Sequence, residues 1–223
     1  MGPPTRRTEL QRQQRRDSRT RILEAASGLL EERRWHELRL EDVMGAAGLS
    51  RTAFYRHFDD RDAMLLAMLD EVREHIGAAG PDWKNGVGDQ AVALRTGLVE
   101  LTEAMRQYGR LMQAIADSAT YDAGMRSARE ELVQGFTDVT AARIRAEVAA
   151  GRSGVGAPQD VAEALVRMSE SHLLAAFGHP PYPETSDVAA TIYEIWASTI
   201  YGREVLEAVP PHEAQRYGAQ RST

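Results

Sequence analysis

The sequence of 223 residues contains no cysteine, which excludes disulfide bonds and metal sites built from thiolates. It also lacks long apolar runs, and the longest stretches, such as residues 173–177, are far too short to cross a bilayer. The N-terminus is rich in arginine and has no apolar core of the kind found in signal peptides. We therefore expect a cytoplasmic protein without a membrane partner.

Signatures of common enzyme classes are missing as well. There is no phosphate-binding P-loop, no Gly-x-Ser-x-Gly nucleophile elbow and no His-Glu-x-x-His zinc motif. The glycine-rich residues 151–156 follow a predicted helix rather than a strand, so phosphate binding is not expected there. Glu71 and His75 lie one helical turn apart, but nothing supplies a third metal ligand, and a solvated pair is the simpler interpretation. We predict that the protein is not an enzyme and has no cofactor or metal.

Charge is divided unevenly along the chain. Residues 1–61 carry 13 Arg against 10 Asp or Glu, a net charge of +3, whereas the whole chain has a net charge of −6. Such a division suggests that one part of the chain binds an anion and that the other part does not. Residues 1–17 are predicted to form an Arg-rich arm that is disordered in isolation, which is compatible with DNA contact in a complex.

Helical periodicity runs through the whole chain. Apolar residues recur at spacings of three and four from Ile22 to Leu30, which is one face of a helix. Further helices are predicted over about 40–47, 51–57, 61–77, 89–107, 110–118, 122–150, 158–177 and 186–208. Residues 77–88 contain four glycines and are the clearest predicted linker. Without a strand pattern or an internal repeat, the fold class is all-α, with about nine helices.

Two of the short predicted helices are joined by a tight glycine turn. The first ends at Gly48, as a helix followed by a C-terminal glycine does, and Ser50 caps the second. This arrangement is a helix-turn-helix, whose second helix normally enters the major groove of DNA. Leu49 and Phe54 are predicted to be the buried anchors between the two helices.

The outer side of the second helix is predicted to face DNA. Arg51 and Thr52 are the expected base readers, because arginine pairs with guanine and the threonine methyl contacts that of thymine. The remaining residues on that side are predicted to contact mainly phosphates: Tyr55, Arg56 and His57.

At residues 20–66 the sequence resembles the N-terminal signature of TetR-family regulators. The resemblance rests on the apolar stripe of the first helix, on Trp35, on the AAGLS turn, on the FYRHF helix and on a basic residue, Arg61, at the start of the next helix. It implies that Arg39, Ser50, Ala53 and Arg61 also belong to the DNA-facing set. Thr52-Ala53 reverses the small-then-hydroxyl order common in the family.

The resemblance also implies a domain organisation. A DNA-binding domain is expected over residues 18–60. A ligand-binding and dimerisation domain is expected over 61–210, with 61–77 as the connecting helix and 211–223 as a tail. The expected partners are a double-stranded operator, an apolar small-molecule effector and a second copy of the chain, which pairs through the helices at about 158–177 and 186–208.

The segments ALVRMSESHLLAAFG (164–178) and IYEIWASTIYG (192–202) are similar to the last two helices of EthR-type members of that family. This similarity implies pocket positions at Leu101, Phe136, Val139, Thr140, Val166, Ser169, Leu174 and Trp196, and Met105 suits an adaptable lining. From spacing alone, ordinary core is the favoured interpretation of these residues. For the whole chain, the alternative to a ligand-released repressor is a helical interaction module that does not bind specific DNA.

Overall fold

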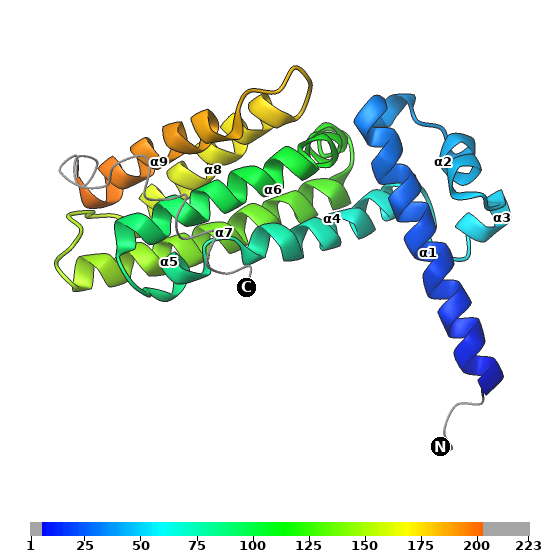
Figure 1. Ribbon diagram of the computed structural model, residues 1–223, viewed down its shortest axis with the longest axis horizontal. Coiled ribbons are helices and arrows are strands. Elements are labelled where there is room, and N and C mark those ends of the chain that lie inside the picture. Colours follow the sequence, from blue (N-terminus) through cyan, green and yellow to red (C-terminus); the bar gives the residue numbers. More distant parts are fainter. Residues whose placement is uncertain (1–5, 203–223) are drawn as a thin grey trace.

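The computed structural model describes residues 6–202, and within that range the chain is helical without any strand (Figure 1). The elements are α1 (Arg6–Glu32), the 3-10 helix η1 (Trp35–Glu37), α2 (Leu40–Ala47), α3 (Arg51–Phe54), α4 (Arg61–Ala78), α5 (Pro81–Asn85), α6 (Gln90–Ser118), α7 (Ala123–Ala149), α8 (Pro158–Phe177) and α9 (Thr185–Tyr201). The predicted all-α class with about nine helices is confirmed.

The helices divide into a head and a body (Figure 1). The head consists of α1, α2 and α3 at one end of the molecule, and the body consists of α5 to α9. Helix α4 begins beside the head and runs into the body, where it packs against α6 and α7. In the body, α6 packs against α4, α8 and α9, and α7 packs against α8, so that α6 lies at the centre.

The N-terminal helix is longer than the sequence pattern indicated. Helix α1 begins at Arg6, so residues 6–17 of the predicted disordered arm are helical instead. The physical reason is local, because neither glycine nor proline occurs between Arg6 and Ser27 and most residues of that stretch favour helices. Residues 1–5 of the predicted arm lie outside the described residues.

The expected linker at residues 77–88 contains the short helix α5. Pro81 occupies its first turn, where a missing N–H costs nothing, and Gly80 and Gly86 bracket it with φ angles of +65° and +70°. The backbones of Gly80 and Gly97 are in contact, which leaves no room for a side chain on either. These glycines therefore dock α5 onto α6 and do not act only as a flexible spacer.

Helix α6 continues through the break that was predicted between residues 107 and 110. Gly109 lies inside α6, next to the backbone of Phe177 at the end of α8. A side chain at this position would collide with that backbone, so Gly109 permits a close helix crossing and does not end the helix.

Helix α9 ends at Tyr201, and the last residues of the predicted helix 186–208, from 203 on, lie outside the described residues, as does the predicted tail at 211–223. None of the helices in the described part of the chain has the length and apolar character needed to span a bilayer.

Candidate functional site

The turn between α2 and α3 follows from its sequence. Gly48 ends α2 with a φ angle of +63°, in the left-handed region that favours glycine, and the amide of Leu49 donates to the carbonyl of Met44 at 3.0 Å. The hydroxyl of Ser50 accepts from the amide of Ala53 at 3.3 Å and caps α3. Leu49 is half-buried against the core. The turn therefore fixes where α3 begins relative to α2.

Helix α3 is shorter than predicted. It covers the four residues Arg51–Phe54 and not the whole of 51–57. After Phe54 the chain tightens, and the amide of His57 donates to the carbonyl of Phe54, three residues back, at 2.8 Å. Phe54 and Phe58 are both buried, and their ring centroids lie 5.4 Å apart. Packing of these two rings holds both ends of residues 54–58 against the head.

The residues predicted to read DNA separate into exposed and half-buried ones. Arg51, Thr52, Tyr55 and Arg56 are exposed, and Ala53 and His57 are half-buried. Arg51 is held on two sides, since one guanidinium nitrogen donates to a carboxylate oxygen of Glu41 at 2.8 Å and the other donates to the hydroxyl of Tyr55 at 3.3 Å. The Tyr55 hydrogen bond and the Glu41 charge raise the pKa of Arg51, so its guanidinium stays charged.

Two other residues expected at the DNA surface have structural partners in the head. Arg39 is exposed and precedes α2, where its amide donates to Asp42 at 3.1 Å. Arg61 is half-buried, and its guanidinium donates to the carbonyl of Trp35 at 2.6 Å and lies 4.6 Å from the centre of the Trp35 ring. In this conformation Arg61 therefore fastens the start of α4 to η1.

Sequence reasoning did not single out Glu41 or Arg21, although both shape the candidate DNA surface. Glu41 pairs with Arg51, and Arg21 of α1 donates to the carbonyl of Ala47 at 2.5 Å, at the C-terminus of α2. An arginine at that helix end interacts favourably with the helix dipole. Neither role is visible from spacing, because each joins residues on different helices.

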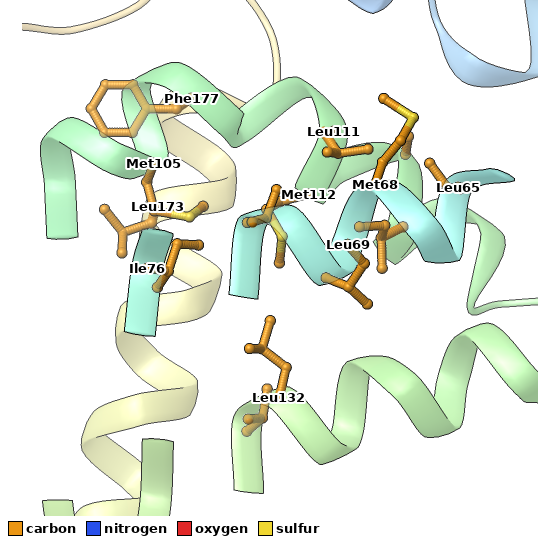
Figure 2. Packing of buried hydrophobic residues seen from close by; sticks show 14 of the residues in the cluster. Leu65, Met68, Leu69, Ile76, Met105, Leu111, Met112, Leu132, Leu173 and Phe177 are labelled. Carbon is orange, nitrogen blue, oxygen red and sulfur yellow. The ribbon is translucent and has the colours of Figure 1, made fainter. Parts of the chain in front are cut away.

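The body contains two adjoining chambers. The wide chamber has a volume of about 90 Å³ and the narrow chamber about 60 Å³. The two chambers share five lining residues: Ile76, Leu101, Phe136, Thr140 and Trp196. Figure 2 shows Ile76 of α4, Met105 of α6 and Leu173 of α8 side by side at the wide chamber.

Most of the predicted pocket residues meet at these chambers. Besides the four that line both, the wide chamber is lined by Met105, Val166 and Ser169. Val139 lines the narrow chamber, although 42% of its surface is exposed. Leu174 is a correction, because it lines neither chamber and its neighbour Leu173 lines the wide one. Adjacent residues of a helix point in directions about 100° apart, so a shift of one position changes the face.

Three polar side chains in the walls, those of Ser169, Trp196 and Trp83, have hydrogen-bond partners within the protein. The indole nitrogen of Trp196 donates to the hydroxyl of Ser169 at 2.9 Å, and that hydroxyl donates to the carbonyl of Leu165 at 2.8 Å. Trp83 lines the narrow chamber, packs edge-on against Trp196 and donates to the hydroxyl of Tyr201 at 2.9 Å. The walls therefore offer an incoming molecule mostly apolar surface.

Comparison with known proteins identifies the family. A family model for bacterial regulatory proteins of the tetR family matches residues 22–68, which include the helix-turn-helix. A second model, for the C-terminal domain of the transcriptional regulator EthR, matches residues 94–202, which hold most of the chamber residues. This chain belongs to the TetR family. It is a DNA-binding transcriptional regulator of the EthR type.

Relatives and solved structures agree with this TetR-family assignment. The HTH-type transcriptional regulator EthR of Mycolicibacterium smegmatis is 29% identical over 83% of this chain and 87% of its own length. Two solved structures share the fold at low identity. SmeT, the repressor of a Stenotrophomonas maltophilia multidrug efflux pump, covers 89% of this chain and 97% of its own, with a TM-score of 0.68 at 17% identity. FadR from Bacillus subtilis, solved with stearoyl-CoA, covers 82% and 98%, with a TM-score of 0.67 at 11% identity. The curated relatives are regulators and not enzymes.

In this TetR-family chain the body holds the head through Arg110 of α6. Its guanidinium donates to the carbonyl of Leu30 at 2.7 Å and to that of Arg33 at 3.1 Å, where α1 ends. Arg110 lies between Met105 and Met112, which both line the wide chamber. The helix that forms part of the chamber wall thus also caps the main helix of the head.

Much of the apolar surface of α8 and α9, the helices expected to pair two copies of the chain, is internal. Leu165, Leu173, Ile192, Trp196 and Ile200 are buried within the chain. The apolar stripes of these amphipathic helices pack onto the body's own core. The outer faces of the same helices remain exposed or half-buried: Ala164, Met168, Ser171, Ala175, Thr191, Ile195 and Thr199.

Proposed function

We propose that this TetR-family regulator is a homodimeric repressor that leaves an inverted-repeat operator when an apolar small molecule enters the two chambers. One observation carries the proposal. Ile76 lines both chambers and belongs to α4, the helix that begins in the head, so a ligand in either chamber touches the element that joins body and head. The chambers and the DNA surface are therefore mechanically connected by one continuous helix.

Release from the operator requires that the ligand bind one conformation of the protein more tightly than another. A ligand that widens the chambers pushes against Ile76 and changes the direction of α4 relative to α6. The hydrogen bonds of Arg110 to the end of α1 then transmit movement of α6 to the head. A ligand that prefers the shifted conformer by about 1–3 kcal/mol lowers operator affinity by roughly 5-fold to 150-fold.

The DNA-binding part of the proposal assigns roles to exposed residues of the head. Arg51 and Thr52 read bases, and Tyr55 and Arg56 contact phosphates, because these four side chains are exposed on and directly after α3. Ser50 and Ala53 contribute through the backbone at the start of α3, and His57 and Arg39 flank this surface. Arg61 reaches a phosphate only if it releases the carbonyl of Trp35.

Dimerisation is proposed through the outer faces of α8 and α9. Small side chains such as Ala164, Ser171 and Ala175 on α8 permit close helix approach, and Met168 and Ile195 add apolar area. Two copies related by a twofold axis form a four-helix interface from these helices. Such a dimer presents two α3 helices to successive major grooves about 34–36 Å apart.

Selection of bound fragments from genomic DNA by the purified full-length protein tests the repressor proposal. The expected result is a set of inverted repeats, bound with an affinity that falls steeply with salt because phosphate contacts release counterions. The alternative, a helical interaction module without specific DNA binding, predicts no enriched sequence. Failure to enrich any sequence at low salt would therefore reject the repressor and favour that alternative.

A further inference from the structure

The only lysine of the chain, Lys84, lies at the wall of the narrow chamber. Its ammonium group donates to the carbonyl oxygen of Gly77 at 2.7 Å and lies 5.8 Å from the centre of the Phe136 ring. Neither partner carries a negative charge, and the ion pairs formed by the described residues do not include Lys84. An ammonium group has three hydrogens to donate, so this cation has capacity for a further acceptor.

The surroundings of Lys84 favour an anion that arrives with a ligand. The group is half-buried, and burial lowers the pKa of Lys84 because a charged amine is less stable away from water. The charge of Glu100 acts on it in the opposite direction. Glu100 uses a carboxylate oxygen to accept from the amide of Gly80 at 2.8 Å and forms no ion pair with the lysine. The charge of Lys84 is therefore only partly offset by the protein.

The other charged residue that lines the chambers differs in this respect. Glu170 lines the wide chamber, and its carboxylate forms an ion pair with Arg129 at 2.9 Å. The negative charge of Glu170 is balanced by that partner, whereas the direct contacts of the Lys84 ammonium group are a carbonyl oxygen and a ring, neither of them charged. The two adjoining chambers therefore differ in charge, because the wide chamber is apolar and the narrow chamber has a positively charged group in its wall.

We propose that the narrow chamber receives the anionic head group of the effector, with Lys84 as its contact, while the apolar tail lies past Phe136 and Trp196 in the wide chamber. The ligand class is an amphipathic carboxylate such as a medium-chain fatty acid. A single cation in a chamber of about 60 Å³ matches one compact, singly charged group. This inference rests on the proposed function, because it names the chemistry of the effector that the chambers bind.

Binding of octanoate and of its uncharged methyl ester to the full-length protein tests this assignment. Trp83 and Trp196 line the narrow chamber, so tryptophan fluorescence reports ligand entry. In the wild type, octanoate is expected to bind more tightly than methyl octanoate. Lys84→Met, which keeps the unbranched stem, is expected to weaken octanoate binding roughly tenfold and to leave ester binding unchanged, as loss of a charge-assisted hydrogen bond requires.

Glu100→Gln is the matched control, because it removes the negative charge that acts on Lys84. Removing that carboxylate is expected to strengthen octanoate binding severalfold without changing ester binding. Equal ratios of acid to ester affinity in the wild type, Lys84→Met and Glu100→Gln would overturn the head-group assignment, and so would the absence of octanoate binding to the folded wild type. Lys84→Gln provides the same comparison if the methionine variant does not fold.

A second measurement separates this inference from the repressor proposal. Operator fragments obtained by selection are titrated with protein in the presence of octanoate or methyl octanoate. If octanoate binds through Lys84 but operator affinity is unchanged, the head-group assignment stands and ligand-released repression fails. If the ester releases DNA as well as the acid does, and Lys84→Met changes neither, repression stands and the head-group assignment fails.

Discussion

The helix-turn-helix of the head and the chamber walls of the body are built from helices of different length. In the head, α2 has 8 residues and α3 has 4, and their functional side chains are exposed. In the body, α6 has 29 residues and α7 has 27, and their functional side chains enclose chambers. Short helices are marginal by themselves and depend on caps and tertiary packing, whereas long helices can surround a cavity and still bury a core.

The two regions also differ in the sequence distance of the contacts that define them. In the head, the Ser50 cap joins residues 3 positions apart and the Arg51–Glu41 pair joins residues 10 apart. In the body, the Trp83–Tyr201 bond joins residues 118 apart. From the proposed function we expect substitutions in the head to change DNA binding alone, and substitutions at the chambers to change ligand and DNA binding together.

The strongest test of this separation is Arg51→Ala. Loss of the guanidinium removes a base contact and is expected to weaken specific operator binding by roughly 5-fold to 150-fold, without lowering thermal stability. Arg145→Ala removes the same charge from α7 and serves as the control in gel-shift titrations. Normal operator binding by Arg51→Ala would show that α3 is not the reading element.

Thr140→Trp tests the opposite prediction for the body. Thr140 is buried and lines both chambers, so an indole there occupies space that a ligand uses. We expect about tenfold weaker operator binding, because the filled cavity imitates the ligand-bound conformer. Overpacking is also expected to lower the free energy of unfolding by about 1–3 kcal/mol. Gln134→Trp, on the exposed side of the same helix, is the control. If neither operator affinity nor thermal stability changes, the chambers have no regulatory role.

Arg110→Ala tests the connection between the two regions. The variant loses both hydrogen bonds to the end of α1, and the free energy of unfolding is expected to fall by about 1–3 kcal/mol. A smaller ligand-induced change in operator affinity is also expected. Arg106→Ala, one turn earlier on α6, removes only a contact with the Tyr182 ring and is the control. Equal ligand responses in the two variants would exclude Arg110 as a coupling residue.

The smallest effect is expected from Tyr55→Phe. The change removes the hydroxyl that accepts from Arg51 at 3.3 Å and leaves the ring in place. A long hydrogen bond at an exposed position contributes about 0.5–1.5 kcal/mol, so specific binding should weaken by roughly 2-fold to 10-fold. Tyr121→Phe removes an equivalent hydroxyl from the body, and both variants are compared by operator titration. An equal, negligible loss in both would mean that Tyr55 neither positions Arg51 nor contacts DNA.

Local patterns predicted most of the helices but not where some of them end. The caps at Gly48 and Ser50 were predictable, because each is formed within a few residues of its own helix. The break expected near Gly109 was wrong, since a glycine that ends a helix and one that permits a crossing look the same in sequence. The start of α1 at Arg6 was also missed, because a high density of like charge was taken as a sign of disorder.

For the sites, the sequence alone determined the helix-turn-helix and the start of α3 directly after Ser50, since a three-residue turn and one short helix leave few ways to arrange them. Only the tertiary structure decided that Glu41 holds Arg51, that Leu173 and not Leu174 lines the wide chamber, and that Lys84 reaches the narrow one. The physical reason is that packing against its neighbours sets the rotation of a helix about its axis. A rotation of about 100°, the angle between successive residues, turns a side chain from the chamber to the surface.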